Sequence, residues 1–348
     1  MMKIFLTGGT GFIGQPLTKA LLARGWNVIA LVRKPDSPKA HALTRMGAQC
    51  VAGDVTDSES MRFGMTGADI VIHNAGWYEV GIPNSAQTLM HSVNVQGTDN
   101  VLSLALETGI SRVVYISTVA HYGDTGAEVR DETYRRQAPY RSYYEQTKAE
   151  AHEVALQYQQ RGLPLITICP AHVVGPNDHS AYGYFQRMYV NRLMPPFAWA
   201  PNTVHSPVHV MDVAEGITLV AEKGQLGETY ILAGEATTRR QELEMWAMQP
   251  GGFRVSFFLP FWLAALMFAS MEPVQRWLGL PASISRETVL SDKSSLSFSS
   301  AKAQRELGWT HRPARQMWSS IIEEEHKLLS VRKKRDLVSR LKPGEASE

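Results

Sequence analysis

Tyr144 and Lys148 are the residues whose types and spacing most directly suggest catalysis. They stand four residues apart at the start of a predicted helix, and this spacing puts both side chains on one helix face. A phenol is a useful acid at neutral pH when its pKa falls below its ordinary value of about 10, and a nearby ammonium group can lower it. We therefore expect Tyr144 to act as a general acid or base, with Lys148 lowering its pKa. The spacing occurs by chance in many helices, so its weight depends on the other motifs.

The glycine-rich segment at residues 7–14, TGGTGFIG, predicts a loop that binds the pyrophosphate of a dinucleotide. It lies between an apolar run at Ile4–Leu6 and a helix expected from Gln15 through Arg24, which Gly25 ends. Its glycine spacing is one residue wider than G-x-G-x-x-G, but it still allows a tight turn and close approach of phosphates to the helix N-terminus. The predicted contacts come from Gly8, Thr10, Gly11, Phe12, Ile13 and Gly14.

Basic residues after the second apolar run bear on which dinucleotide is bound. Arg33 and Lys34 stand where an NAD-specific site usually presents Asp or Glu to the ribose 2′-hydroxyl. Two cations can instead neutralise a 2′-phosphate, which favours NADP over NAD, with Arg33 as the main contact. The alternative is two exposed basic residues at a strand end. Asp54 and Val55, after the third run, are expected beside the adenine, although Asp54 could instead cap a turn.

Short apolar runs alternate with helix-like stretches from the N-terminus onward. Continuous apolar strands joined by helices specify a parallel sheet covered on both faces, which is an α/β, doubly wound Rossmann fold. The expected strands are Ile4–Leu6, Val28–Val32, Gln49–Ala52, Ile70–His73, Val113–Ser117 and Leu165–Cys169, with strand-like returns at Thr203–Val210 and Tyr230–Ala233.

After residue 169 the chain becomes rich in proline, aromatic residues and methionine, which predicts a smaller C-terminal substrate-binding lobe. We expect a dinucleotide-binding domain at residues 1–170 with returning segments near 203–235, and the lobe at 171–202 and 236–330. Residues 331–348 are predicted to form a basic, mobile tail, since residues 332–348 hold six basic and three acidic side chains. A solvated helix end explains that charge more simply than a patch for lipid or nucleic acid.

Composition excludes several classes of protein. With 348 residues, 44% of them hydrophobic, the chain can bury a large core, and it is neither disordered nor collagen-like. A formal net charge of +2 argues against nucleic acid as a partner. Cys50 and Cys169 form no metal-like pair and are expected to be reduced, and no signal-like run precedes Ile4, so we predict a cytoplasmic protein without a metal.

One apolar stretch, Phe257–Met271, is broken by Pro260 and is shorter than the ~20 residues that a membrane-spanning helix needs. It is therefore not predicted to cross a membrane. The stretch could instead form a pocket wall, part of the core or a peripheral membrane contact, and the sequence does not choose among these three interpretations.

Taken together, the motifs resemble the extended short-chain dehydrogenase/reductase family, of the NAD-dependent epimerase/dehydratase type. The resemblance covers nearly the whole chain, and it is greatest to the dihydroflavonol-reductase and 3β-hydroxysteroid-dehydrogenase branch. The matching pieces, in the order expected for the family, are Thr7–Gly14, Asp54-Val55, His73–Gly76, Asn94–Thr98, Ile116–Thr118, Tyr122-Gly123, Tyr144–Lys148, Cys169-Pro170, Gly175-Pro176, Val208–Val213, Ser300–Ala303 and Leu307–Trp309.

This resemblance implies catalytic roles. Tyr144 would exchange a proton with the substrate oxygen while hydride moves to or from the nicotinamide, and Lys148 would also hydrogen-bond the nicotinamide ribose. Thr118 would orient the substrate oxygen, with Ser117 as the alternative. Asn94 would support a structural water or the helix geometry near the site.

The same resemblance implies contacts to the cofactor at the ends of two further strands. The residues are His73, Asn74, Ala75 and Gly76 along the cofactor, and Pro170, His172 and Val173 on the nicotinamide side. For His73 and His172, a hydrogen-bonded histidine without a role in catalysis is an equal alternative.

The predicted lobe favours a hydrophobic substrate, because aromatic and methionine side chains cluster at residues 182–189 and 253–271. They could form an apolar pocket for a steroid-, terpenoid- or flavonoid-like molecule, or simply pack the lobe. Nucleotide-sugar members of the family commonly carry arginine before the position of Pro170 and asparagine two residues after it, where this chain has Cys169 and His172.

The sequence therefore predicts an NADP-dependent oxidoreductase that exchanges hydride with a ketone or secondary alcohol, with NAD as the alternative cofactor. The alternative functions are a nucleotide-sugar epimerase or dehydratase and a non-catalytic NADP sensor that binds a protein. A homodimer is left open.

Overall fold

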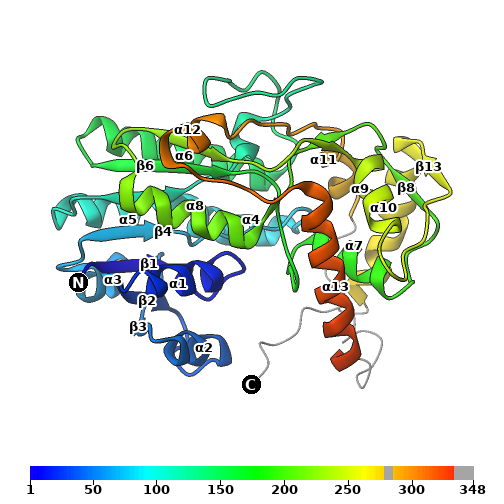
Figure 1. Ribbon diagram of the computed structural model, residues 1–348. Helices are drawn as coiled ribbons and strands as arrows, with labels where there is room; N and C mark the ends of the chain where they lie inside the picture. The colour runs from blue at the N-terminus through cyan, green and yellow to red at the C-terminus, as the bar shows by residue number, and fades with distance from the viewer. Residues whose placement is uncertain (278–284, 333–348) are drawn as a thin grey trace.

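The computed structural model describes residues 1–277 and 285–332, and a seven-stranded parallel sheet is its centre (Figure 1). The strand order is β11-β6-β5-β4-β1-β2-β3. The strands are β1 (Lys3–Thr7), β2 (Asn27–Val32), β3 (Gln49–Ala52), β4 (Ile70–His73), β5 (Val113–Ile116), β6 (Leu165–Pro170) and β11 (Thr229–Leu232). The strand side chains are buried on both faces across most of the sheet, which explains why these runs are continuously apolar.

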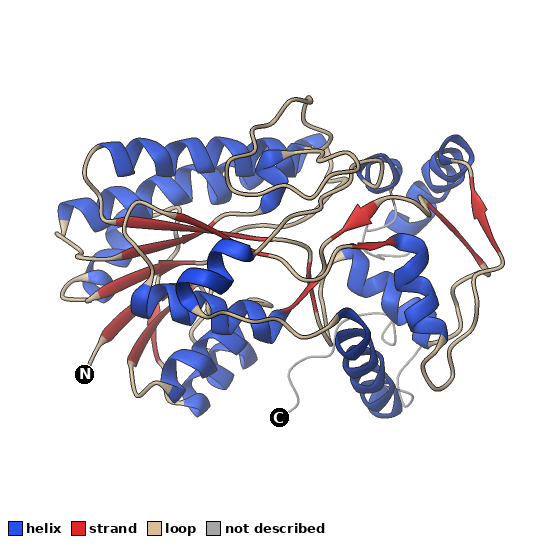
Figure 2. Ribbon diagram, turned by 45° about the horizontal axis from the view of Figure 1, so that its top comes forward, coloured by secondary structure: helices blue, strands red, loops and turns tan. Residues whose placement is uncertain are grey.

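Helices cover both faces of the sheet, as Figure 2 shows. On one face pack α1 (Gly14–Ala23), α2 (Pro38–Met46), α8 (Val210–Lys223) and α12 (Ala301–Leu307). On the other pack α3 (Ser58–Met65), α5 (Gly97–Glu107) and α6 (Tyr143–Gln160). The predicted doubly wound fold is confirmed.

A second group of elements lies beside the sheet, at the end away from the N-terminus (Figure 1). Its members are β7 (Val173–Val174), α7 (Ala181–Val190), β8 (Phe197–Trp199), α9 (Arg239–Ala247), β13 (Phe257–Leu259), α10 (Phe261–Trp277), α11 (Arg286–Ser291) and α13 (Ala314–Arg332). Aromatic rings make much of its core: Trp246 packs edge-on against Tyr189 and Trp318, with ring centroids 5.2 and 5.5 Å away. We call this group the aromatic lobe.

Most predicted elements are in place within a residue or two. The first helix begins at Gly14, one residue before the predicted start, and Gly25 follows its end with φ +73°. The prediction of a single strand at Thr203–Val210 is wrong. Two short strands, β9 (Val204–His205) and β10 (Val208–His209), pair outside the central sheet, with β12 (Thr237–Thr238) and β7 respectively, and Val210 already begins α8. Pro207, between them, has no N–H for a continuous ladder.

Two predictions concern the C-terminal part of the chain. The run at 257–271 is divided by Pro260 into β13 and α10, and within the described ranges no helix combines the length and apolarity needed to cross a bilayer. The predicted basic tail lies outside the described residues from position 333 onward.

Candidate active site

Tyr144 and Lys148 lie on the first turns of α6, which Ser142 caps by accepting a hydrogen bond from the Glu145 N–H. Lys148 is buried, and its Nζ donates to the Ile116 carbonyl oxygen at the end of β5, over 3.2 Å. The predicted pair therefore faces the carboxyl end of the sheet, where ligands bind in doubly wound folds.

The two pKa values differ from the expectation. Burial raises the pKa of Tyr144, a side-chain hydrogen bond with Thr118 acts in the opposite direction, and Glu145 raises it further. Burial also lowers the pKa of Lys148 to about 8. The prediction that Lys148 brings the phenol pKa down is wrong in this structure, because its ammonium is directed at a backbone carbonyl and does not offset the burial of Tyr144.

Thr118 and Ser117, which the sequence leaves as alternatives, lie in different surroundings. Thr118 hydrogen-bonds Tyr144, and its Oγ1 accepts from the Ala120 N–H at the start of the 3₁₀ turn η2 (Val119–Tyr122). Ser117 is buried, and its Oγ lies 3.2 Å from His152 Nδ1. Of the two hydroxyls, Thr118 is the one that the geometry puts beside the phenol.

Behind Ser117 lies a cluster that the sequence did not predict, made of His121, His152 and Cys169. His121 Nε2 is 3.7 Å from Cys169 Sγ, and the two imidazole rings are 3.8 Å apart. Burial lowers the pKa of His152 to about 4 and raises that of Cys169 to about 12, so both are neutral near pH 7. Their ligand atoms lie within 4.8 Å of one another, which would suit a metal ion, but the neighbouring cations Lys148 and Arg136 oppose one.

Asn94 joins the loop after β4 to helix α6. It lies in the π-helical turn η1 (Ser92–Gln96), a distortion of the helix that follows α4 (Asn84–His91). Its Oδ1 accepts from the Trp77 N–H at 2.7 Å, and its Nδ2 donates to the Trp77 carbonyl and to Thr147 Oγ1, each at 3.1 Å. Of its two predicted roles, these contacts correspond to supporting the local helix geometry.

The glycine loop has the geometry that a pyrophosphate requires. Gly8 has φ +72°, and a Cβ at Gly14 would lie 2.0 Å from the Gly8 carbonyl oxygen, so the loop and helix approach more closely than a side chain allows. The first turn of α1, which is fully within the described chain, has no acidic side chain and no side-chain cap. Its N–H groups therefore present an uncompensated positive end. Thr10, Phe12 and Ile13 lie in the same loop.

The end of β4 is hydrogen-bonded to the glycine loop. Thr7 Oγ1 accepts from the Ala75 N–H at 3.1 Å, and Asn74 Nδ2 donates to the Gly8 carbonyl at 3.2 Å. His73 is fully buried between Thr7 Oγ1 and Thr98 Oγ1, at 2.8 and 3.1 Å.

Burial lowers the pKa of His73 to about 3, so it is neutral. The expectation that the His73 side chain lines the cofactor is wrong, since that side chain is fully buried and hydrogen-bonds Thr7, at the start of the glycine loop, and Thr98. Gly76 faces the site: a Cβ there would lie 3.5 Å from Asn94 Oδ1 and 4.0 Å from Lys148 Nζ.

The residues predicted around the adenosine half lie at the ends of β2 and β3. Arg33 and Lys34 are exposed. Asp54 Oδ1 accepts from the N–H and hydroxyl of Thr56, both at 2.9 Å, which is the turn-capping alternative. Val55 is buried.

On the nicotinamide side, Pro170 ends β6 and Val173 starts β7. His172, between them, is half-buried, and the edge of its ring meets Tyr182 of the aromatic lobe at 4.4 Å. Burial lowers the pKa of His172 to about 3, so it is a neutral side chain where the sheet meets that lobe.

Two further contacts were missed by sequence reasoning. The Tyr78 ring meets the Tyr144 ring edge-on at 4.8 Å; its only sequence signal is its position two residues after Gly76. Arg136 donates to Glu145 Oε2 at 3.3 Å and to the His121 carbonyl at 2.9 Å, so it ties the start of α6 to η2. Nothing in the sequence near Arg136 indicates this role.

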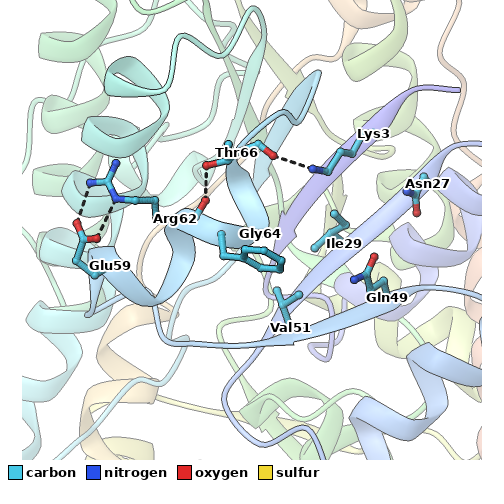
Figure 3. A pocket seen from close by; sticks show the side chains of 10 residues that line it. Lys3, Asn27, Ile29, Gln49, Val51, Glu59, Arg62, Gly64 and Thr66 are labelled. Carbon is cyan, nitrogen blue, oxygen red and sulfur yellow. Dashed lines mark hydrogen bonds and ion pairs between the residues drawn. The ribbon is translucent and has the colours of Figure 1, made fainter.

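A surface recess elsewhere does not coincide with this site (Figure 3). Lys3, Asn27 and Gln49, which line it, begin β1, β2 and β3, so it opens at the amino ends of the strands. The dinucleotide site of a doubly wound sheet lies at the carboxyl ends of the strands, which is the opposite side from the recess. We therefore assign the recess no role in catalysis.

Comparison with known proteins decides the family. The model of the NAD-dependent epimerase/dehydratase family matches residues 4–233, which include the glycine loop, Tyr144 and Lys148. The chain belongs to this family. It is therefore an NAD(P)-dependent enzyme of the extended short-chain dehydrogenase/reductase type.

Its relatives include proteins named as reductases. A 4-hydroxy-2-methyl-3-oxo-4-farnesyl-3,4-dihydroquinoline-1-oxide ketoreductase of Stigmatella aurantiaca is 29% identical over 339 residues, covering 93% of this chain and 96% of the relative. A putative dihydroflavonol 4-reductase of Synechocystis is 31% identical, covering 87% and 89%. The solved structure of gox2253 is 30% identical with a TM-score of 0.78, covering 94% and 99%. A mouse 3β-hydroxysteroid dehydrogenase type 7 is 28% identical, covering 87% and 90%, so relatives of the predicted branch are among the matches.

Proposed function

We propose that this oxidoreductase uses NADPH to reduce a ketone on a hydrophobic small molecule to the secondary alcohol. The observation that carries the proposal is the half-buried Tyr144 phenol, hydrogen-bonded to Thr118 on a helix face shared with Lys148. The residues present fit a dinucleotide, because the glycine loop packs tightly against the start of α1 and leads to the uncapped N–H groups of that helix, which suit its phosphates. When bound, the nicotinamide would supply the hydride.

The proton needed for reduction would come from Tyr144. A phenol carries its proton at neutral pH, and burial, which raises the pKa of Tyr144, keeps it in the neutral form that can donate to a carbonyl oxygen gaining negative charge. The same burial makes Tyr144 a weaker acid than a phenol whose pKa is lowered. Oxidation of an alcohol would need the phenolate, which burial disfavours. Thr118 would donate a second hydrogen bond to that oxygen, and Lys148 would bind the ribose beside Gly76.

The preference for NADP over NAD rests on Arg33 and Lys34 at the end of β2. Both side chains are exposed, and within the described residues neither forms an ion pair. Each could therefore contact a 2′-phosphate without first breaking an ion pair. The corresponding Asp or Glu of an NAD site would repel that phosphate.

A hydrophobic substrate is favoured by the aromatic lobe beside the nicotinamide end. Tyr182, which contacts His172, also packs near Phe185 and Trp246, with ring centroids 6.4 and 5.9 Å away. The matched ketoreductase is named for a farnesylated quinoline oxide, which is a molecule of this class. An apolar pocket lined by side chains of this kind would suit flat or prenylated ketones.

The test is loss of NADPH absorbance with a panel of steroid, terpenoid and flavonoid-like ketones. Tyr144→Phe should lower kcat by about 10²–10⁴-fold, the usual contribution of a positioned acid. Tyr143→Phe, one residue away on the same helix, should leave kcat unchanged. Full turnover in Tyr144→Phe would overturn the mechanism.

Cofactor choice has its own test. Arg33→Ser should raise the KM for NADPH about 10-fold or more, as expected for a lost charge-assisted contact, and leave the KM for NADH unchanged. Equal effects on both cofactors would contradict the 2′-phosphate contact. The competing function, epimerisation or dehydration of a nucleotide sugar, predicts tightly retained nicotinamide and no net NADPH consumption with any ketone.

A further inference from the structure

The outer end of the aromatic lobe exposes large apolar side chains that the proposed chemistry does not use. Phe257 of β13 is 52% exposed, and Trp262 and Leu266 of α10 are 69% and 63% exposed. We call these three residues the apolar end patch. Figure 1 shows β13 and α10 at the end of the molecule farthest from the N-terminus.

Helix α10 has two different sides. Trp262 and Leu266 are one turn apart on the outer side. Ala264 and Phe268 are buried on the inner side, where the Phe268 ring packs edge-on against Trp199 at 4.9 Å. The helix is thus held to the lobe by one side, while the other side carries the large apolar side chains of Trp262 and Leu266 into solvent, where an ordinary surface helix is polar.

Cations border the apolar segment, although the residue that follows it, Glu272, and Asp292 beside Lys293 are acidic. Residues 253–271 include a single charged side chain, the exposed Arg254, and no carboxylate. Two further cations border the segment: the Arg240 guanidinium lies 4.6 Å from the Phe258 ring centroid, and Lys293 Nζ lies 5.6 Å from that of Phe261. Aromatic and aliphatic side chains bordered by Arg and Lys are complementary to a bilayer surface with anionic head groups.

The patch is connected to the active site through the lobe. From Phe268, ring contacts pass through Trp199, Phe185 and Tyr182 to His172, with centroid distances of 4.9, 5.9, 6.4 and 4.4 Å. A surface that holds this lobe against lipid would therefore bring the nicotinamide side of the enzyme close to the place where hydrophobic molecules accumulate.

We propose that the apolar end patch docks the enzyme on the surface of a lipid bilayer, with Phe257, Trp262 and Leu266 inserted among the acyl chains and Arg240, Arg254 and Lys293 at the head groups. This is peripheral binding by one helix face. Docking on a bilayer does not depend on the proposed function; only its use in receiving a membrane-dissolved ketone rests on that function.

Vesicle co-sedimentation of the full chain tests this. The wild type should bind phosphatidylcholine vesicles containing phosphatidylglycerol, and bind pure phosphatidylcholine more weakly. Trp262→Ser with Leu266→Ser should reduce partitioning by about 10-fold or more, since each side chain loses its apolar transfer energy. Phe63→Ser is the matched control: it removes an aromatic side chain that is 84% exposed on α3 and should leave partitioning unchanged.

Two outcomes would overturn the proposal: equal vesicle binding by wild type and double variant, or absence of binding together with concentration-dependent dimerisation that the double variant loses. The second would assign the patch to another copy of the chain. Vesicle binding is measured without turnover. The binding result can therefore be interpreted even if the protein proves not to be a reductase. NADPH affinity, which the double variant should keep, shows that it is folded.

Discussion

The carboxyl end of the parallel sheet and the aromatic lobe are built by different kinds of contact. At the sheet, polar groups fix one another individually: His73 joins Thr7 to Thr98, and Asn94 joins Trp77 to Thr147. In the lobe, rings pack on rings, as around Trp246. A hydrogen bond requires particular atoms at a particular distance, whereas apolar packing accepts many side chains of similar volume.

That difference explains why sequence motifs reveal the carboxyl end of the sheet but not the aromatic lobe. The glycine loop and the Tyr144/Lys148 pair have residue types that few substitutions could replace. The lobe is recognisable only by its aromatic composition, and composition alone does not say which ring is buried and which is exposed. Chemistry common to a family is thus concentrated in the first region, and substrate choice and surface contacts are left to the second.

The largest expected effect on stability comes from the lobe. Trp246 is fully buried, so Trp246→Ala should lower the free energy of unfolding by about 3–5 kcal/mol, measured by chemical denaturation. Trp262→Ala, at the exposed patch, should change it by less than about 0.5 kcal/mol. If the two variants lost equal stability, the distinction between the inner core and outer face of the lobe would fail.

Next in size is a change confined to the glycine loop. Gly14→Ala places a methyl group where the Gly8 carbonyl oxygen lies, and should weaken NADPH binding by about 100-fold, on the order of 3 kcal/mol, measured by calorimetry. Gly126→Ala is the control, because no atom lies within 4 Å of the added Cβ, and its positive φ of +62°, which Gly14 does not share, adds only local backbone strain. An affinity loss of similar size in Gly126→Ala would mean that general destabilisation, and not the close approach at the loop, is responsible.

The smallest effect concerns a single proton in the polar region. Lys148, with its pKa lowered to about 8, is charged below that pH and neutral above it. If the ammonium binds the ribose, kcat/KM for NADPH should be constant below about pH 8 and fall up to 10-fold for each pH unit above it. Lys148→Arg, which stays charged, should shift this alkaline decrease upward. A profile unchanged by that substitution would assign the decrease to another group.

Some features of the site could be predicted because they depend on local pattern. Gly8 and Gly14 have the close backbone approaches that their motif implies, and Tyr144 and Lys148 share a helix face because their spacing equals about one turn. Other features depend on residues distant in the chain. The sequence prefers Thr118 to Ser117 only through the family resemblance, whereas in the structure the two differ in what lies beside them, Tyr144 for Thr118 and His152 for Ser117.

Apolar runs, glycine spacing and helix periodicity act over short stretches of chain, so the sequence alone predicts the parallel sheet, the close-packed glycine loop and the helix face that Tyr144 and Lys148 share. The pKa values of the site follow from the tertiary structure, because burial raises the pKa of Tyr144, lowers that of His73 to about 3 and lowers that of Lys148 to about 8. The tertiary structure alone decided, too, that Trp246 is core while Trp262 faces outward. Desolvation and exposure depend on everything packed around a group, and most of those neighbours are far away in the chain.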